Sequence, residues 1–353
     1  MSTLLIIKIV IILIIFTITL VIAMYSTYME RKVAAVMQDR IGPDRAGPWG
    51  ILQPLADGGK MFFKEDFIPK KSEKWLFILG PGIAMFTACM TGAVIPWGGT
   101  VTMFGETFSL QIADIDIGIL YILAFVSIGV YGIMIGGWAS NNKYSLYGAV
   151  RASSQMISYE LAMGLAILAV VMSTGSLSLK DIVESQSGGH WNVIYQPLAF
   201  LLFIVCAFAE CNRAPFDLAE CETELIGGYH TEYSSMKLGF FLFAEYINMF
   251  ISAAVISVLF FGGYNFPFMH ELGLSSNAIT FIGVGVFFAK IIFFIFFFMW
   301  VRWTLPRFRY DQLMHLGWKS LIPLAIINLI ITGAWLIFKD DPSATWSILK
   351  DSF

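Results

Sequence analysis

Charged residues are scarce in this sequence. Aspartate, glutamate, lysine and arginine make up 13% of its 353 residues, compared with roughly 25% in soluble domains. Hydrophobic residues make up 58%, and the mean hydropathy is +0.74. This composition excludes a soluble globular protein and predicts a chain that crosses a membrane several times. The net charge of −3 says little about partners, and nothing in the sequence supports nucleic-acid binding.

Ligands for redox groups are also few. The four cysteines follow neither a CxxC pattern nor iron–sulfur spacing, and the four histidines all lie outside the apolar runs. No pair of histidines can therefore ligate a haem inside the bilayer. We expect no metal site, no catalytic residue and no bound redox cofactor in this chain. The cysteines expected to be reduced structural thiols are Cys89, Cys206, Cys211 and Cys221.

Eight apolar runs are long enough to cross a bilayer, which takes about 17 to 25 residues. The candidate helices are residues 4–27, 76–98, 117–138, 156–175, 195–211, 238–262, 279–301 and 321–338. No soluble domain, low-complexity linker or internal repeat interrupts them. Residues 1–353 are therefore predicted to form one all-α membrane domain.

The segments between these runs divide lysine and arginine unequally. The basic segments are residues 28–75, 139–155, 212–237 and 302–320. Together they hold seventeen lysines and arginines, whereas the opposite segments hold three. Because cytoplasmic loops are enriched in these residues, the basic segments are predicted to face the cytoplasm or matrix, with both termini on the outer face.

The first basic segment is too polar to span a membrane and too regular for a plain loop. Two Gly-Pro pairs mark turns at its start, and apolar and polar residues then recur with helical spacing over residues 49–65. This pattern predicts an amphipathic helix on the membrane surface, although Gly58 and Gly59 weaken it. Such a helix could clamp the bundle, or it could cover a lateral opening for a lipid-soluble ligand.

Two carboxylates lie inside predicted spans, where a charge costs several kcal/mol unless it meets a partner, water or a proton. Glu160 lies nine residues after Arg151, roughly 13 Å along its helix. Glu245 lies eight residues after Lys237, roughly 12 Å along another helix that starts on the inner side. Glu210 reaches the same level from the end of the fifth span. We predict one acidic cavity there, in which crowded carboxylates take up protons near neutral pH.

An acidic loop, residues 212–237, follows the fifth span. Asp217, Glu220 and Glu224 stand at i, i+3 and i+7, so they share a face if this piece is helical. In that case they extend the acidic cavity. The alternative is a solvated loop whose carboxylates simply face water.

One lysine also lies within a predicted span. Lys290 is central in the seventh apolar run, so its charge needs a partner. We expect it to neutralise Glu160 and Glu245 or to belong to a proton relay. A lone lysine that snorkels to the membrane surface is the alternative.

Four segments resemble the signature segments of one protein family. They read MERKVAAVMQDRIGPDRAGPWGILQPLADGGKMFFKED, GWASNNKYSLYGAVRASSQMISYEL, AECNRAPFDLAECETELIGGYHTEYSSMKLGFFLFAEY and WVRWTLPRFRYDQLMHLGWK. In order and with few gaps between about residue 29 and residue 320, the chain resembles the quinone-site membrane subunit of respiratory complex I. The family that it resembles comprises the H-type membrane subunits of bacterial NADH:quinone oxidoreductase.

The resemblance implies a place at the heel of the membrane arm, in the bacterial plasma membrane, where the peripheral arm docks. A narrow tunnel would lead quinone, either ubiquinone or menaquinone, from the lipid past the first helix and the surface helix. Its headgroup site, the FMN and the iron–sulfur clusters would belong to peripheral partner subunits. Quinone reduction would then change the charge of an acidic funnel, and the change would pass through small membrane subunits to antiporter-like subunits that pump protons.

The resemblance also assigns roles by position. The acidic funnel would comprise Glu160, Glu210, Asp217, Glu220, Glu222, Glu224, Glu232 and Glu245, with Lys290 added from its place in the span. The quinone tunnel would be framed by Arg31, Arg40, Trp49, Asp57 and Lys60. The cations that hold the loops and dock the peripheral arm would be Arg213, Arg302, Arg307 and Arg309. For these arginines, simple anchoring by positive charge on the inner face is the alternative.

Two other classes of function fit parts of the sequence. The related subunit of membrane-bound hydrogenase or formate-hydrogenlyase complexes shares the bundle, but QDRIGPDRAGPWG and the surface helix favour complex I. A stand-alone proton-coupled transporter would also use intramembrane glutamate and lysine. The missing repeat and the basic inner face argue against it.

Overall fold

The computed structural model describes residues 3–340 apart from residues 104, 221, 268, 270–272 and 274. Cys221 and the tail from residue 341 lie outside this part of the chain, as does the side chain of Glu222. Among the described residues, seven helices are long and apolar enough to cross a membrane, and a bent pair makes eight if it counts as one span. The predicted all-α membrane fold is confirmed.

Helices make up nearly all of the regular structure. The long apolar ones are α1 Thr3–Met37, α3 Lys74–Thr91, α4 Gly118–Ala139, α5 Lys143–Thr174, α10 Ser235–Phe260 and α11 Ser276–Thr304, and the last span joins α12 Tyr310–His315 through π-helical Leu316–Leu321 to α13 Ile322–Asp340. The shorter helices are α2 Gln53–Phe63, α6 Leu179–Ser185, α7 Asn192–Tyr195, α8 Pro197–Glu210 and α9 Glu222–Leu225. The strands β1 Thr100–Met103 and β2 Glu106–Ser109 pair as an antiparallel hairpin.

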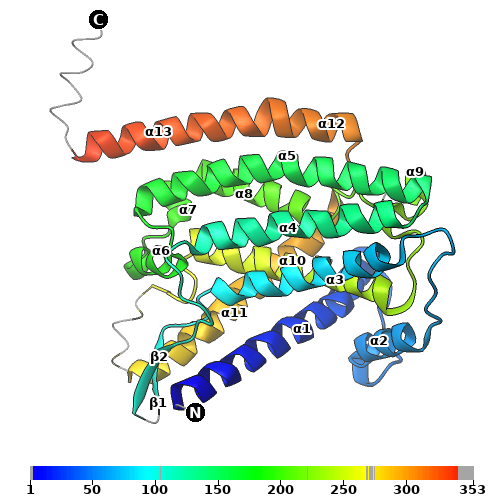
Figure 1. The fold of residues 1–353 in the computed structure, drawn as a ribbon. Coiled ribbons are helices and arrows are strands. Elements are labelled where there is room, and N and C mark those ends of the chain that lie inside the picture. Colours follow the sequence, from blue (N-terminus) through cyan, green and yellow to red (C-terminus); the bar gives the residue numbers. More distant parts are fainter. Residues whose placement is uncertain are drawn as a thin grey trace, which may run out of the picture.

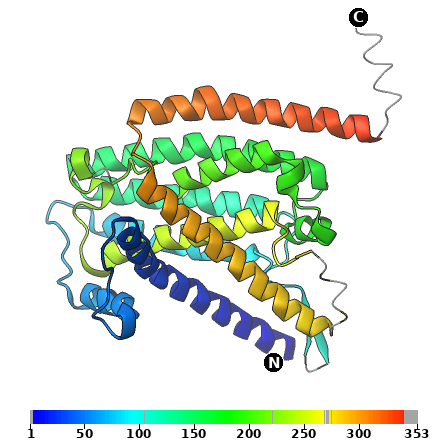
Figure 2. The ribbon, with the colours of Figure 1, turned by 180° about the vertical axis from the view of Figure 1, so that it is seen from behind.

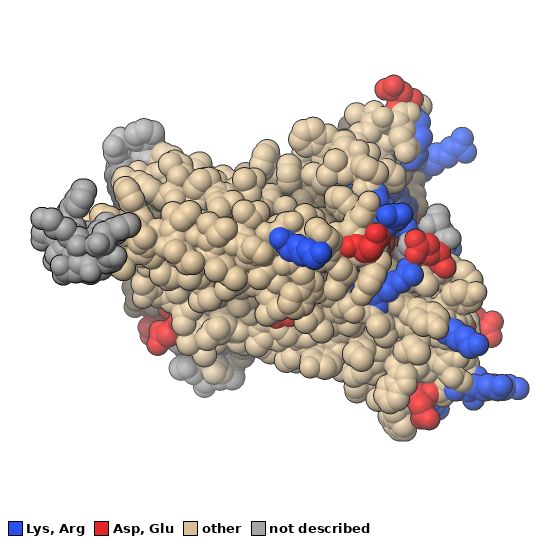
Figure 3. Space-filling model, turned by 90° about the horizontal axis from the view of Figure 1, so that it is seen from above, with Lys and Arg blue, Asp and Glu red and all other residues tan. Residues whose placement is uncertain are grey.

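The helices lie side by side in a flattened bundle. In Figure 1, α12 and α13 form one edge, α5 lies next to them, and α1 forms the opposite edge. Figure 2 shows that α1 and α11 cross the back of the bundle at an angle to the other helices. The start of α1, the end of α13 and the hairpin share one end of the molecule (Figure 1). On the face seen in Figure 3, lysine and arginine gather at the other end.

Several spans are longer than the apolar runs that predict them, among them α1 and α5. α1 continues to Met37 because neither glycine nor proline interrupts the sequence before Gly42. α5 begins at Lys143, where the side-chain oxygen of Asn142 accepts a hydrogen bond from the Tyr144 N–H at 2.9 Å and caps the helix. Both extensions carry polar residues, which a search for apolar runs cannot detect.

α8 is the shortest membrane helix. It has 14 residues, or about 21 Å of helix at 1.5 Å per residue. The segment Ser187–Tyr195 precedes it and bends by 74° at the break between the two. α8 therefore ends at Glu210 while the neighbouring helices α5 and α10 continue past it.

Small residues bring α3 and α4 together. A Cβ atom built on Gly80 would lie 2.8 Å from the Cα of Gly136, and one on Gly132 would lie 2.8 Å from the backbone nitrogen of Ala84. Such close backbone approach is typical of helices that associate in membranes through van der Waals packing. The pair forms a rigid wall, against which α5 packs on α4 and α10 packs on α3.

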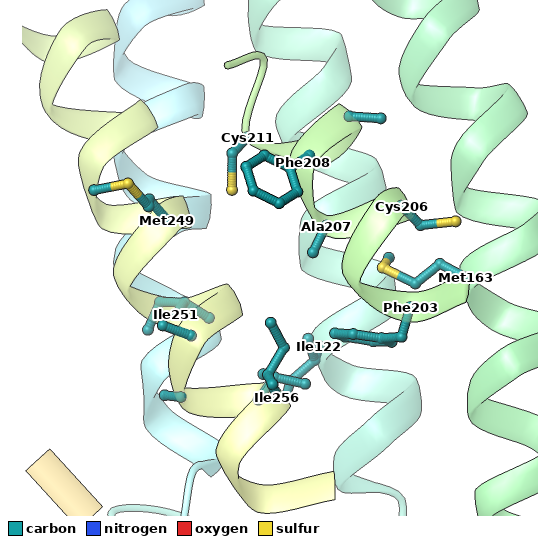
Figure 4. Close-up of a cluster of buried hydrophobic side chains, with 14 of the residues drawn as sticks. Ile122, Met163, Phe203, Cys206, Ala207, Phe208, Cys211, Met249, Ile251 and Ile256 are labelled. Carbon is teal, nitrogen blue, oxygen red and sulfur yellow. The ribbon is translucent and has the colours of Figure 1, made fainter. Parts of the chain in front are cut away.

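An apolar core lies between α8 and α10. Figure 4 shows Phe208 of α8 next to Cys211 and across from Met249 of α10, while Cys206 lies beside Met163 of α5. Cys211, just after α8, is also buried, and both of these cysteines are free thiols. The core thus holds the end of α8, and with it Glu210, at a fixed depth.

The acidic loop does not form the continuous helix that would place the carboxylates from Asp217 to Glu224 on one face. The chain runs through turns until the single turn Glu222–Leu225. Gly228 then adopts a φ of +59°, and any Cβ there would collide with the carbonyl oxygen of Ala219. The condition for a shared face, a helix through Asp217 and Glu220, is therefore not met, and a glycine turn folds the loop back on itself.

Candidate functional site

Glu30 of α1 is the centre of a buried ionic cluster. Its side chain accepts hydrogen bonds from Arg213 at 3.2 Å, from the Tyr246 hydroxyl at 2.8 Å and from Arg302. Only 6% of Glu30 is exposed. It is missing from the residues predicted from the sequence because the first span was expected to end at residue 27. The uninterrupted run from there to Gly42 is the signal that identifies it as helical.

Arg213 joins Glu30 to Glu245. Its Nη2 lies 3.7 Å from Oε2 of Glu245, and its guanidinium lies 4.1 Å from the centre of the Tyr246 ring. Burial alone would lower the pKa of Arg213, but Tyr246, Glu30 and Glu245 raise that pKa well above its ordinary value. Arg213 therefore stays charged and ties α1 to α10 through the acidic loop.

Both carboxylate oxygens of Glu245 have a partner. The Tyr229 hydroxyl donates to Oε1 at 3.0 Å, while Arg213 faces Oε2. The carbonyl oxygen of Tyr229 accepts a hydrogen bond from Ser145 Oγ at 2.6 Å, which ties the loop to α5. Burial and the charges of Glu245 and Glu220 raise the pKa of Tyr229 well above its ordinary value. Tyr229 thus remains a proton donor.

Asp217 and Glu220 each lie beside a basic side chain. Arg307 Nη2 donates to Asp217 at 2.9 Å, and His230 Nε2 lies 3.4 Å from Glu220. Burial raises the pKa of Asp217 to about 6, and Glu220 adds to that rise while Arg307 opposes it. Burial would also raise the pKa of Glu220, but His230 and Arg213 outweigh it and lower that pKa. Burial would lower the pKa of His230, but Glu220 raises it.

Glu210 and Glu245 share a small cavity inside the bundle. The cavity measures about 20 Å³, which is room for about one water molecule. Glu160 lies close enough to Glu210 for their charges to interact, and it accepts a hydrogen bond from Ser127 Oγ of α4. The three carboxylates predicted to meet from separate spans therefore do lie together.

A larger cavity, of about 340 Å³, lies between α1, α2, α10 and the end of α11. Arg31 of α1 and Asp57 of α2 both line it and form an ion pair at 2.7 Å. Its apolar lining includes Met24, Met61 and Phe243. The charged residues along its wall are Glu30, Arg31, Arg40, Asp57, Arg213, Glu220, Glu245 and Arg302. One space thus connects predicted tunnel residues with predicted funnel residues.

Trp49 and Lys60 are not among the residues that line this cavity. The predicted helix over residues 49–65 is shorter in the structure, because Trp49 lies in the turn before α2 with a φ of 53°. Its ring is exposed, and its carbonyl oxygen accepts a hydrogen bond from the Tyr28 hydroxyl at 2.7 Å. Lys60 of α2 is also exposed.

Two loop carboxylates lie apart from the buried cluster. Glu224 forms an ion pair with Arg151 at 2.6 Å, and 53% of its side chain is exposed. Glu232 accepts a hydrogen bond from Asn142 Nδ2 at 2.6 Å, at the turn between α4 and α5. A solvated loop describes these two positions better than an acidic funnel does.

The four cations predicted to dock partners differ in their surroundings. Arg213 and Arg302 both contact Glu30 in the buried cluster. Arg307 is about one-third exposed and reaches into the loop. Arg309 pairs with Asp311 at 3.2 Å, and both side chains lie on the surface.

Lys290 does not pair with the carboxylates. Its ammonium donates three hydrogen bonds of 2.7 Å to the backbone carbonyls of Phe261, Gly263 and Asn265, just after the end of α10. It also lies 5.5 Å from the centre of the Trp191 ring. The expectation that it neutralises Glu160 and Glu245 is therefore wrong, because the end of α10 offers three carbonyl acceptors. These acceptors follow the C-terminal end of α10, whereas Arg213 contacts Glu245 and Tyr246 in the first half of this helix.

Membrane-spanning helices, buried ion pairs and a cavity bounded by the amphipathic helix α2 define a polytopic membrane protein with charged side chains buried in its bundle. Residues 8–333 match the family described as NADH dehydrogenase, and the chain belongs to this family.

Similarity to named relatives covers nearly the whole chain. It is 68% identical over 330 residues to an NADH-quinone oxidoreductase H subunit of Cytophaga hutchinsonii, covering 94% of this chain and 96% of that protein. It is 62% identical over 339 residues to the H subunit of Flavobacterium johnsoniae, covering 96% and 97%. It is 52% identical over 324 residues to the H subunit of Leptospira biflexa, covering 89% and 90%. The resemblance to the membrane subunit of complex I is confirmed.

Proposed function

We propose that this membrane subunit of NADH-quinone oxidoreductase admits quinone from the lipid and couples its reduction to proton translocation through buried acids. One observation carries the proposal. The cavity of about 340 Å³ is lined both by the pair Arg31 and Asp57, between α1 and α2, and by Arg213 and Glu245. A ligand in this space would touch the access route and the acids together.

The size and lining of the cavity support quinone access. Small-molecule sites usually measure about 300–1,000 Å³ and combine apolar walls with a few polar groups. Met24, Met61 and Phe243 offer apolar surface for an isoprenoid chain, and Arg31 and Arg40 offer donors for a passing headgroup. The amphipathic helix α2 then acts as the cover of a lateral opening, as well as an anchor.

The contacts of Arg213 and Glu245 support the coupling role. A change of charge in the larger cavity acts on Glu245 directly and through Arg213, which lies 3.7 Å away. Glu245 shares the smaller cavity with Glu210, and Glu210 interacts with Glu160. When one of these carboxylates takes up a proton, its negative charge is neutralised. It then repels the charge of the next carboxylate less, so that neighbour ionises more readily and charge can pass between them.

The remaining parts of the proposal concern the surroundings of the chain. We assign the FMN, the iron–sulfur clusters and the quinone headgroup site to peripheral partner subunits, and pumping to antiporter-like subunits reached through small membrane subunits. Quinone is then the substrate of the complex, and this chain is a non-redox subunit of it. The membrane would be the bacterial plasma membrane, with the basic end of the bundle towards the cytoplasm and both termini outside.

The test uses membranes that contain the whole complex. Arg40→Ala should raise the apparent KM for quinone several-fold, while Glu245→Gln should lower both quinone-linked turnover and proton uptake by vesicles. Electron transfer from NADH to ferricyanide reports assembly of the peripheral arm and should stay at the wild-type level in both variants. Lys64→Ala is the matched control, because Lys64 is an exposed cation just after α2. Wild-type quinone affinity in the first variant and full pumping in the second would refute the proposal.

A further inference from the structure

The hydroxyl of Ser127 lies between two acceptors. Ser127 Oγ is 2.9 Å from the carbonyl oxygen of Leu123, one turn earlier in α4, and it also donates to Oε1 of Glu160 on α5. A serine hydroxyl carries one proton and two lone pairs. It can therefore donate to only one of these acceptors at a time, while its oxygen remains able to accept a hydrogen bond.

Each protonation state of Glu160 has a complete set of hydrogen bonds in this arrangement. An ionised carboxylate only accepts, so the Ser127 proton points to Glu160, and a bond to a charged acceptor is the stronger one. A protonated carboxyl group has a proton to donate. It then donates to Ser127 Oγ, and the Ser127 proton turns back to the carbonyl oxygen of Leu123.

We propose that Ser127 is a positioning residue that reverses its hydrogen bond as Glu160 gains and loses a proton. The inference rests on the proposed role of Glu160 in the proton route. The reversal breaks no covalent bond within Ser127 and moves no net charge through it. A buried polar group left without a hydrogen-bond partner costs free energy. Because of the reversal, neither protonation state of Glu160 leaves such a group.

Two other buried serines of the bundle each donate to a single acceptor, the carbonyl oxygen one turn earlier in their helix. Ser257 of α10 donates to the carbonyl oxygen of Ala253 at 2.9 Å and is fully buried. Ser153 of α5 donates in the same way to the carbonyl oxygen of Ala149 at 2.8 Å. Bonding one turn back along the helix is thus common here. Among the described serines that bond in this way, Ser127 differs in that its hydroxyl also reaches a carboxylate. Ser257 supplies a matched control.

Titratable side chains lie near Glu160 and on the elements that pack against α5. Glu210 of α8 interacts with Glu160 through charge, and Tyr159 precedes Glu160 on α5 but donates to the carbonyl oxygen of Leu313 at 3.0 Å. The other titratable side chains on α4, α8 and the α12–α13 span, which pack against α5, are Tyr121, Tyr131, Cys206, Tyr310, Asp311, His315, Lys319 and Lys339. The turn Gly228–His230, α9 and α6 also pack against α5 and add Tyr229, His230, Glu224, Lys180, Asp181 and Glu184. The test therefore compares variants of Ser127 with Glu160→Gln in one background.

The experiment measures the assembled complex in membranes. Infrared difference spectra identify the carboxyl C=O band of Glu160 as the band that Glu160→Gln removes, and quinone-linked turnover is recorded against pH. Ser127→Ala should shift that band to higher frequency. It should also move the acidic limb of the pH profile about one unit higher, a tenfold change, because a hydrogen bond to the charged form is lost.

Two variants and one control decide the outcome. Ser127→Thr keeps the hydroxyl and should restore the wild-type band and profile, while the near-isosteric Ser127→Cys, a weak donor, should fall between the two. Ser257→Ala should change neither. If Ser127→Ala and Ser127→Cys match wild type while Glu160→Gln loses turnover, the role of Ser127 is overturned and that of Glu160 stands. If Glu160→Gln itself keeps wild-type turnover and pumping, the proposed proton route fails first.

Discussion

Glu30 and Arg213 are separated by 183 residues in the sequence, yet Oε2 of the glutamate lies 3.2 Å from Nη1 of the arginine. Both side chains are more than nine-tenths buried. α1 crosses the back of the bundle at an angle (Figure 2). The contact between Glu30 and Arg213 ties the C-terminal part of α1 to the start of the acidic loop. Two parts of the site proposed to act together are thus held by one ion pair.

Glu30→Gln should weaken the assembled subunit. Removing one partner of a buried ion pair costs roughly 3–5 kcal/mol, because it leaves the other charge uncompensated. Here Arg213 and Arg302 would both lose the charge of Glu30, while Arg213 would keep the more distant Glu245, at 3.7 Å. We expect less intact complex on native gels and a melting temperature lower by several degrees. Glu65→Gln removes an exposed glutamate and should change neither; equal loss in both variants would contradict the explanation.

Asp217→Asn should change how stability depends on pH. Burial raises the pKa of Asp217 from 3.8 to about 6, so the folded state prefers its protonated form. The stability contributed by this group is fully present below its unfolded pKa and is lost as the pH rises through about 6. Asparagine never ionises, so the variant should melt a few degrees above wild type at about pH 8, and the gain should shrink near pH 5.

Thermal unfolding of the purified complex at several pH values gives the measurement. Asp311→Asn, at a side chain that is 70% exposed, is the control and should shift the melting temperature little at any pH. A gain for Asp217→Asn that is the same at both pH values would show that the raised pKa is not its source.

Tyr229→Phe should lower coupled activity and leave the fold intact. The change removes the hydroxyl that donates to Glu245 at 3.0 Å and keeps the packed ring. A hydrogen bond to a charged group contributes about 1.5–3 kcal/mol, so a loss of roughly tenfold or more in pumping rate is expected. Fluorescence quenching in vesicles measures this rate. Tyr195→Phe removes an exposed hydroxyl that contacts His190 at 3.0 Å, and pumping should continue normally.

Lys290→Met separates a structural role from a relay role. The lysine holds three backbone carbonyls at 2.7 Å each, and each buried acceptor left without a partner costs about 1–3 kcal/mol. The variant should therefore melt lower, while the protons pumped per quinol stay unchanged in the complex that remains. Lys319→Met, at an exposed lysine, should keep the wild-type melting temperature. Lost pumping with an unchanged melting temperature would assign Lys290 to the relay after all.

Hydropathy and charge spacing predict the bundle and the depth of its acids. Glu160, Glu210 and Glu245 could be placed together because distance along a helix follows directly from residue number. Glu30 could not, because the polar end of α1 resembles the loop that follows it. Lys290 was paired wrongly for a related reason. Spacing along one helix gives depth but not the partner across the bundle, and here the partner is a set of backbone carbonyls.

The acidic loop was predicted only in part. Its composition indicates carboxylates on the inner side, but composition cannot separate Asp217, which is buried beside Arg307, from Glu224, which is more than half exposed. The turn at Gly228 decides which of them face inward, because it directs the chain back across Ala219. Backbone conformations of this kind depend on tertiary contacts that residue spacing does not contain.

The short helix α8 has an electrical consequence. The hydrocarbon core of a bilayer is about 30 Å thick, and 14 helical residues cover about 21 Å of it. The polar acidic loop follows α8 directly after Glu210, so we expect a thinner insulating layer beneath Glu210 than elsewhere. A membrane potential, worth about 2.3 kcal/mol per elementary charge for each 100 mV, then falls more steeply across α8. The occupancy of Glu210 by a proton should respond to voltage as well as to pH.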